Sequence, residues 1–140
     1  LRITMVFGAA GGVFPVLRRL ARFGLGGRMG SGVQFVSWIH IVDFLRAVEW
    51  LLAEEAFNGP VNLAAPNPLP NAEMMTLMRQ AVGMPLGLPA TERMLEIGAL
   101  FLRTETELIL KSRRVVPGRL LAAGFQFQFP EMGAALQDLA

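Results

Sequence analysis

The 140-residue sequence contains no cysteine and a single histidine, His40. Without thiols the chain can form no disulfide, no thiolate nucleophile and no cysteine-ligated zinc site, and this absence fits a cytoplasmic location. One imidazole cannot build a metal site by itself. We therefore interpret His40 as a packing or hydrogen-bonding residue rather than a general base. Asp43, three residues further on, is its expected partner.

Charged residues are also scarce. They make up 17% of the sequence, against about 25% in an average soluble domain, whereas 53% of the residues are hydrophobic. The longest uncharged run, residues 56–72, is rich in asparagine and proline and cannot form an apolar membrane-spanning helix. We expect neither a membrane span nor a secretory signal. The surplus apolar surface instead predicts a protein partner, either another copy of this chain or a domain that it lacks.

The formal net charge is only +2, and arginine supplies most of the basic residues. The basic side chains gather in one place, at Lys111, Arg113, Arg114 and Arg119. Aromatic residues that could stack on bases are not interleaved with them. We interpret this cluster as a solvated face, and we expect no nucleic-acid partner.

Hydrophobic periodicity predicts alternating strands and helices in the first 83 residues. The apolar run at 1–7 is typical of a buried parallel strand, and a glycine-rich turn ends it. The elements expected after it are a helix at 13–23, a short strand at 34–38, a helix from 41 or 42 to 54, a strand at 60–64 and a helix at 71–82.

Two of these helices carry more detailed predictions. Asn71 is expected to cap the helix at 71–82. The helix that ends at 54 should bury one apolar face. The residues expected on that face are Val42, Leu45, Val48, Leu52 and Trp50.

The stretch 84–140 changes to a mostly helical character. Helices are expected at 91–102, 105–112, 117–123 and 131–139. The segment Phe125-Gln-Phe-Gln-Phe129 alternates apolar and polar residues and predicts a strand. We therefore expect an α/β fold with a domain at 1–83, built from two parallel-type strands with helices, and a small domain at 84–140 with a short strand pair.

The glycines do not form a dinucleotide fingerprint. Gly8 and Gly11 fit its start, but Phe14 stands at the third glycine position, and Arg28 occupies the place of the acidic residue. We interpret the turn after residue 7 as structural. The second glycine-rich segment, 24–32, is either a structural loop or a mobile loop beside a substrate, with Arg28 as its anion contact.

The residues alone reveal no catalytic constellation. The carboxylates at Glu49, Glu54 and Glu105 lie on predicted helix faces with polar neighbours and are interpreted as solvated. Ser31 and Ser37 lack the flanking glycines of a nucleophile elbow.

Several motifs, in order along the chain, nevertheless resemble a known family. The strings 35–43 (FVSWIHIVD) and 59–67 (GPVNLAAPN) are similar to the substrate half of extended short-chain dehydrogenase/reductases. Trp-Ile-His at 38–40 resembles the NAD(P)-dependent, nucleoside-diphosphate-sugar-epimerase-like subgroup. The end of the chain, 112–130, is similar to that subgroup's C-terminal domain of unknown function.

This resemblance covers nearly the whole chain but only the second half of the family pattern. The family's amino-terminal Rossmann part carries the glycine fingerprint and a catalytic Tyr-x-x-x-Lys pair, and this sequence has no tyrosine. The resemblance therefore implies an incomplete Rossmann-like part followed by a small substrate-side domain. It also implies NAD(P) as the cofactor of the full-length family, and we expect no tight binding by this chain alone.

The resemblance also implies positions for site residues. Phe7 and Gly8 would end the strand that flanks the cofactor, and Arg28, Trp38 and His40 would border the substrate cleft. No metal ligand and no catalytic residue is expected in this chain.

We therefore expect a truncated, epimerase-like chain that supplies the substrate-binding half and is not catalytic alone. The alternative is a stand-alone binding or oligomerisation module that reuses the fold without chemistry. The expected partner is a second copy, with exchange of strands, or the missing amino-terminal Rossmann half.

Overall fold

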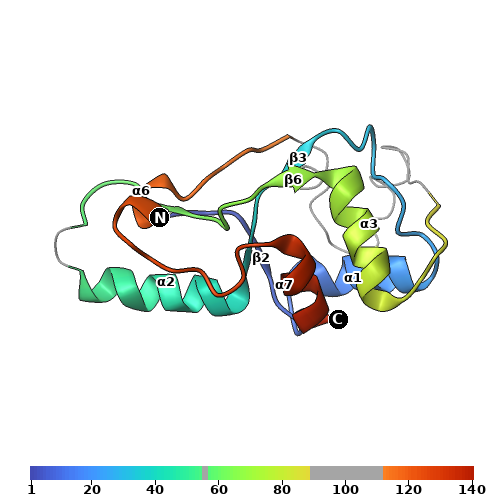
Figure 1. Cartoon of the computed structure of the whole chain (residues 1–140), viewed down its shortest axis with the longest axis horizontal. Helices are drawn as coiled ribbons and strands as arrows, with labels where there is room; N and C mark the ends of the chain where they lie inside the picture. The colour runs from blue at the N-terminus through green and yellow to red at the C-terminus, as the bar shows by residue number, and fades with distance from the viewer. Residues whose placement is uncertain (55–56, 89–111) are drawn as a thin grey trace.

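The computed structural model describes residues 1–54, 57–88 and 112–140 of the chain. It shows a mixed α/β protein of elongated shape, with helix α2 at one end and helices α1 and α3 at the other (Figure 1). The helix predicted at 91–102 lies outside the described residues, and so does the helix predicted at 105–112 except for Ser112, which is not helical. Within the described ranges, no helix combines the length and the apolar character that a membrane span requires.

Short strands hold the centre of the molecule together. Strand β1 (Arg2–Ile3) pairs in parallel with β5 (Asn62–Leu63), and β2 (Met5–Phe7) pairs in parallel with β4 (Trp38–His40). The antiparallel pair is β3 (Phe35–Val36) with β6 (Leu69–Pro70). The parallel pairing predicted for 1–7 is therefore confirmed, with a break at Thr4, but the predicted burial is wrong for β1, which is exposed. The amide and the hydroxyl of Thr4 both donate to the carbonyl of Leu63.

The helices begin and end within about two residues of the predicted positions. They are α1 (Phe14–Arg22), α2 (Ile41–Ala53), α3 (Asn71–Val82), α6 (Gly118–Ala122) and α7 (Met132–Leu139). Gly83 ends α3 in the left-handed conformation, with φ of 72°, which glycine adopts without steric cost.

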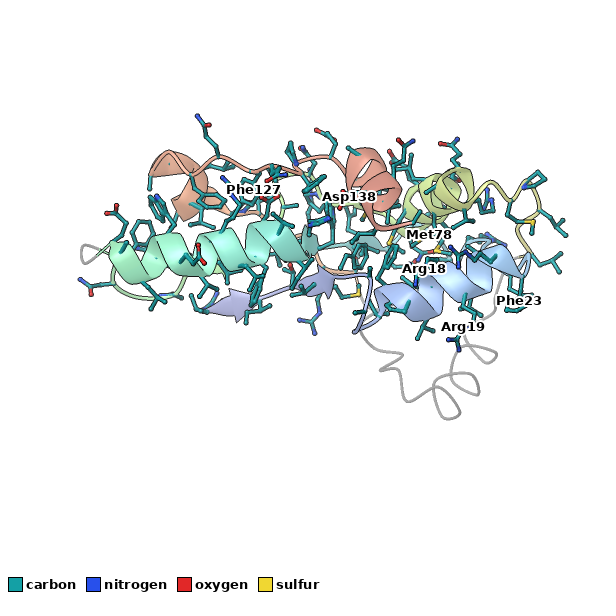
Figure 2. The ribbon with its side chains drawn as sticks, turned by 90° about the horizontal axis from the view of Figure 1, so that it is seen from below. Arg18, Arg19, Phe23, Met78, Phe127 and Asp138 are labelled. Carbon is teal, nitrogen blue, oxygen red and sulfur yellow. The ribbon has the colours of Figure 1, made fainter. Side chains whose placement is uncertain are left out.

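The buried side chains form two clusters. The first core cluster fills the space between α1, α3 and α7, around Phe7 and Trp38. The second lies between α2, β5 and α6, around Ile39 and Leu120. The last helix, α7, belongs to the first cluster, and α6 belongs to the second, so the C-terminal segment packs on both (Figure 2). The domain boundary at residue 83 stays a prediction.

The predicted buried face of α2 is partly wrong. Leu45 is 54% exposed and Leu52 is 81% exposed, whereas the buried residues of this helix are Asp43 and Ala47. The helix turns the face that contains Asp43 toward the C-terminal segment, because this carboxylate binds two backbone amides there. The apolar stripe that includes Leu45 and Leu52 therefore faces away from the core.

The strand predicted at 125–129 is also wrong, since this segment forms no ladder with any described strand. Its alternating phenylalanines contact α2 and one another, and the rings of Phe125 and Phe127 meet edge to face at 4.9 Å. The amides of Gln128 and Phe129 donate to Asp43, each at 2.8 Å. A side chain thus takes the hydrogen bonds that a neighbouring strand would need.

Asn71 does not cap α3 as predicted. It is the first residue of the helix, and Pro70 stands at the cap position without a side-chain hydrogen bond. The Asn71 Oδ1 atom instead accepts from the amide of Met29 at 2.7 Å. Backbone carbonyls cap the helix, because Asn71 and Ala72 donate their amides to Gln34 and Gly32.

Candidate functional site

Strands β2 and β4 end side by side, with Phe7 paired to His40. Gly8 follows Phe7 directly, and α2 begins immediately after His40. In open α/β sheets, ligands bind beyond the carboxyl ends of parallel strands. We call this region, formed by Phe7, Gly8 and His40, the carboxyl edge.

His40 is held from three sides and is only 1% exposed. The amide of Val42 donates to its Nδ1 atom at 3.0 Å, so Nδ1 must carry the lone pair. The hydrogen of the ring therefore lies on Nε2, which is 2.9 Å from Oδ2 of Asp138. Asp138 is labelled on α7 in Figure 2. The ring of Phe129 stacks on the imidazole at 4.0 Å. His40 thus caps α2 and connects strand β4 to α7 through its hydrogen bond with Asp138.

Asp43 is not the partner of His40, contrary to the prediction. Its carboxylate is fully buried and receives the Gln128 and Phe129 amides together with Nη1 of Arg46 at 2.8 Å. These contacts satisfy both oxygens of the carboxylate. Asp43 is therefore a positioning group for the segment that carries Phe129.

Two further predicted site residues, Phe7 and Trp38, contribute no exposed side chain. Both are fully buried, and their rings stack with centroids 6.1 Å apart. The indole Nε1 donates to the carbonyl of Asn67 at 3.2 Å. Any contact between Phe7 and a bound molecule would come from its backbone, and Trp38 can act only by supporting the strand end.

Gly8 differs from these residues because it presents bare backbone at the carboxyl edge. A Cβ atom placed there would lie 3.6 Å from Cβ of Ile41, an ordinary van der Waals distance. The fold itself therefore does not require glycine at this position.

Arg28 lies in the glycine-rich loop, next to the start of α3. A Cβ built on Gly32 would come within 3.0 Å of Cβ of Arg28 and 3.2 Å of Cβ of Ala72. The guanidinium of Arg28 is exposed and has no polar partner among the described residues. The structure thus brings together Phe7, Gly8, Trp38 and His40, and puts Arg28 on a different element.

Hydrogen bonds hold the loop that carries Arg28 in place along its length. Leu88 exchanges two backbone hydrogen bonds with Gly24 and Gly27, and Nη1 of Arg79 donates to the carbonyl of Gly26 at 2.7 Å. Nε2 of Gln34 donates to the carbonyl of Met29 at 2.8 Å. These bonds favour the structural interpretation of residues 24–32 over the mobile one.

Asp138 is the residue of this region that the sequence analysis missed. It stands 98 positions from His40, and no local pattern links the two. In the part of the chain that the structure describes, no group of three acidic or histidine side chains could hold a metal ion.

Comparisons with known proteins place this arrangement in a family. A model of a domain of unknown function, DUF1731, matches residues 92–139. An epimerase family protein from Mycobacterium bovis is 39% identical over 137 residues, which cover 96% of this chain and 44% of that protein. The crystal structure of the human epimerase family protein SDR39U1 with NADPH has a TM-score of 0.89 and 36% identity, and the match covers 99% of this chain and 46% of that one.

This chain corresponds to the C-terminal part of an extended short-chain dehydrogenase/reductase-like epimerase. A nucleoside-diphosphate sugar epimerase from Corynebacterium glutamicum is also similar, with a TM-score of 0.73, 28% identity and coverage of 97% of this chain and 24% of that one. The chain spans a little under half the length of the curated epimerase family proteins that it matches. The resemblance drawn from the Trp-Ile-His and Gly-Pro-Val-Asn motifs is thereby confirmed.

Proposed function

We propose that this chain forms the substrate-binding half of an NAD(P)-dependent, epimerase-like oxidoreductase and that it is not catalytic alone. The observation that carries the proposal is the match of almost the whole chain to less than half of a protein whose crystal structure contains NADPH. The absence of tyrosine from the sequence supports the second part, because the family's Tyr-x-x-x-Lys pair cannot be formed here.

In this proposal, the carboxyl edge faces the cofactor. NAD(P) would supply hydride transfer, and Gly8 would let its ring approach bare backbone. Phe7 would contribute its main chain, because its side chain fills the first core cluster.

Substrate contacts would come from the same region and from the glycine-rich loop. The guanidinium of Arg28 has no polar partner in the described part of the chain, so it suits an anionic group of the substrate. Trp38 and His40 would border the cleft as supports, since both side chains are buried and hydrogen-bonded.

The proposal predicts where the cofactor affinity resides. The 140-residue chain alone should show no saturable NADPH binding below about 1 mM, because one wall of a site retains little of its binding free energy. A chimera that joins this chain to the other half of the human relative should bind NADPH with micromolar affinity. Fluorescence titration of NADPH measures both values, and micromolar binding by the isolated chain would contradict the proposal.

Gly8 offers a test of the site itself. In the chimera, Gly8→Ala should weaken NADPH binding about tenfold, which corresponds to about 1.4 kcal/mol, because its methyl group would cover backbone that the proposed cofactor approaches, while its Cβ lies at an ordinary 3.6 Å from Ile41. Gly118→Ala is the matched control, because a Cβ there meets nothing within 4 Å. Equal affinity for NADPH in the two variants would exclude Gly8 from the cofactor site.

The alternative, a stand-alone binding or oligomerisation module, is favoured by a separate observation. Large apolar side chains are exposed on α2 and at the start of β1, including Leu52 at 81% and Leu1 at 67%. Either a second copy or the other half of a longer protein would cover them.

A further inference from the structure

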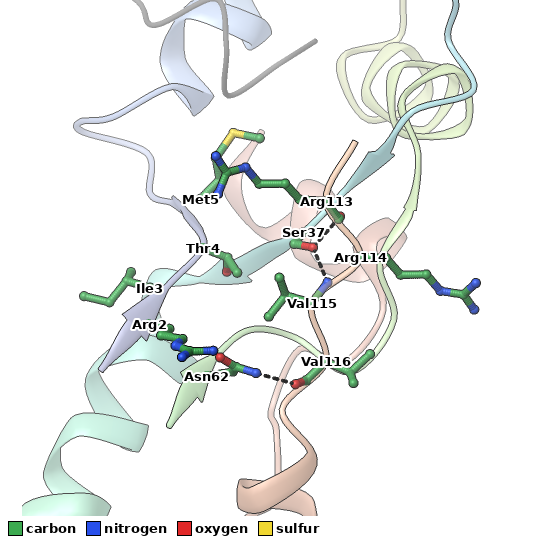
Figure 3. A pocket seen from close by; sticks show the side chains of 10 residues that line it. All are labelled: Arg2, Ile3, Thr4, Met5, Ser37, Asn62, Arg113, Arg114, Val115 and Val116. Atoms are coloured by element: carbon green, nitrogen blue, oxygen red, sulfur yellow. Dashed lines mark hydrogen bonds between the residues drawn. The ribbon is translucent and has the colours of Figure 1, made fainter. Parts of the chain in front are cut away.

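A basic groove lies at the amino ends of the strands, away from the carboxyl edge (Figure 3). Its volume is about 640 Å³, within the range of small-molecule sites. One wall is β1 with the residues that follow it, and the other is the extended segment 112–116, which we call the strap. The residues that line the groove are Arg2, Ile3, Thr4, Met5, Ser37, Asn62, Arg113, Arg114, Val115 and Val116.

The strap is a fixed wall. Oγ of Ser37 donates to the carbonyl of Arg113 at 2.6 Å and accepts from the amide of Val115 at 2.8 Å. Its lower end is held by Asn62, whose amide donates to the carbonyl of Val116 at 3.3 Å. The backbone at Arg113 is therefore already ordered before a ligand binds. This lowers the entropy cost of binding.

Within residues 1–54, 57–88 and 112–140, no acidic side chain compensates the positive charge of the groove. Arg2 and Arg113 rise from opposite walls, and neither guanidinium has a hydrogen bond, ion pair or ring contact with the described residues. By contrast, Arg46 and Arg79 use their guanidiniums within the fold. Arg114 also lines the groove, but its guanidinium extends to the other side of the strap (Figure 3). There it lies over the ring of Phe35, 4.9 Å from the ring centroid. No acidic residue is among the described residues that line the groove.

Between the two guanidiniums the groove is apolar. Ile3, Met5, Val115 and Val116 provide this surface, and Ile3 is 54% exposed. Arginine binds phosphate through a planar fork of donors, and an exposed apolar floor favours an organic body over a bare ion.

We propose that this groove binds a small organic phosphate, with the phosphate on Arg113, the apolar body over Met5 and Val115, and Arg2 at the opposite end of the groove adding to its positive potential. The site is separate from the proposed cofactor edge, because its residues stand at the beginnings of β1, β4 and β5 rather than at the ends of β2 and β4. Its test therefore does not depend on the proposed function.

Phenyl phosphate is the probe, and inorganic phosphate is its comparison. Backbone amide shifts of the 140-residue chain, followed by NMR, should move saturably at residues 2–5 and 113–116. Phenyl phosphate should bind about tenfold more tightly than inorganic phosphate, because only the former covers the apolar floor. Arg113→Gln should weaken it about tenfold, the effect of one charge-assisted contact, and Arg2→Gln, at the opposite end of the groove, should weaken it less.

Arg22→Gln is the matched control, since Arg22 is an exposed arginine of α1 outside the groove. It removes the same charge and should change the affinity less than about twofold. Because the side chains of Arg2 and Arg113 are unpartnered, neither substitution should unfold the chain, and each variant's own spectrum verifies this. The proposal is overturned if no saturable shift occurs at these residues, if Arg22→Gln weakens binding as much as Arg113→Gln, or if both phosphates bind equally.

Discussion

Asp43 and His40 stand three residues apart at the start of α2, yet they bind different parts of the C-terminal segment. Asp43 accepts the amides of Gln128 and Phe129, and His40 contacts Asp138 and the ring of Phe129. Both side chains are buried. The start of this helix therefore acts as the attachment point for residues 128–138.

Asp43→Asn should reveal the strength of that attachment. The amide group that replaces one carboxylate oxygen cannot accept a hydrogen bond, so a buried backbone amide loses its partner. We expect the free energy of unfolding to fall by about 2–4 kcal/mol in urea titrations. Faster hydrogen exchange at Gln128 and Phe129 should accompany the loss.

Glu49→Gln provides the control for this change. Glu49 is an exposed carboxylate of the same helix with no partner among the described residues, so its variant should stay within about 0.5 kcal/mol of the parent. Equal unfolding free energies for the two variants would mean that Asp43 does not hold the C-terminal segment.

Helices α1 and α3 are joined through the glycine-rich loop between them and the strands. Gly26 lies so close to α1 that a Cβ atom would come within 2.8 Å of Cα of Ala21 and 3.0 Å of its Cβ. Arg79 of α3 donates to the carbonyl of the same glycine. The absence of a side chain at Gly26 therefore sets how closely the loop can approach α1.

Gly26→Ala should consequently destabilise the packing of these helices. The contact is with backbone, which cannot rotate away, so we expect a loss of about 1–3 kcal/mol in unfolding free energy. Gly11→Ala is the comparison, because a Cβ there meets nothing within 4 Å. Thermal and urea unfolding distinguish them, and equal stability would show that α1 can shift without cost.

Local patterns predicted these elements well. The 3.6-residue period located α2 and α3 because each helix buries part of an apolar stripe. The same reasoning failed at 125–129, where a period of two is real but Asp43 binds the amides. It also failed at His40, because a contact across 98 positions leaves no trace in local spacing.

The candidate site, too, was predicted where local motifs mark it and missed where it depends on residues distant in the sequence. The motifs located Phe7, Gly8, Trp38 and His40 near one another, and β2 and β4 do end together. Arg28 was grouped with them because of its glycine-rich context, although the loop lies beside α3. The basic groove could not be foreseen, because β1 and the strap are more than a hundred residues apart.

The whole molecule exposes more apolar surface than its two core clusters absorb. Leu45 and Leu52 share one face of α2, and Leu1 and Ile3 are exposed at the first strand. In a protein so poor in charge, this surface predicts association with another polypeptide.

We expect the isolated chain to form dimers through the face of α2 that contains Leu45 and Leu52. Light scattering coupled to size-exclusion chromatography should give a dimer mass, and the Leu45→Glu, Leu52→Glu double variant should shift it to the monomer, because two charges would be buried. Leu121→Glu, on α6, introduces a charge at an exposed leucine elsewhere and should leave the dimer intact. A well-folded monomer of the parent chain would contradict the expectation.

The position of α7 has a consequence for the order of folding. Its residues close the first core cluster, His40 contacts Asp138, and Nη1 of Arg18 donates to the carbonyl of Leu139 across 121 positions. During synthesis, α1 and β4 leave the ribosome long before these partners exist. The apolar surfaces around Phe7 and Trp38 therefore remain exposed, or bound by a chaperone, until residues 132–139 have emerged.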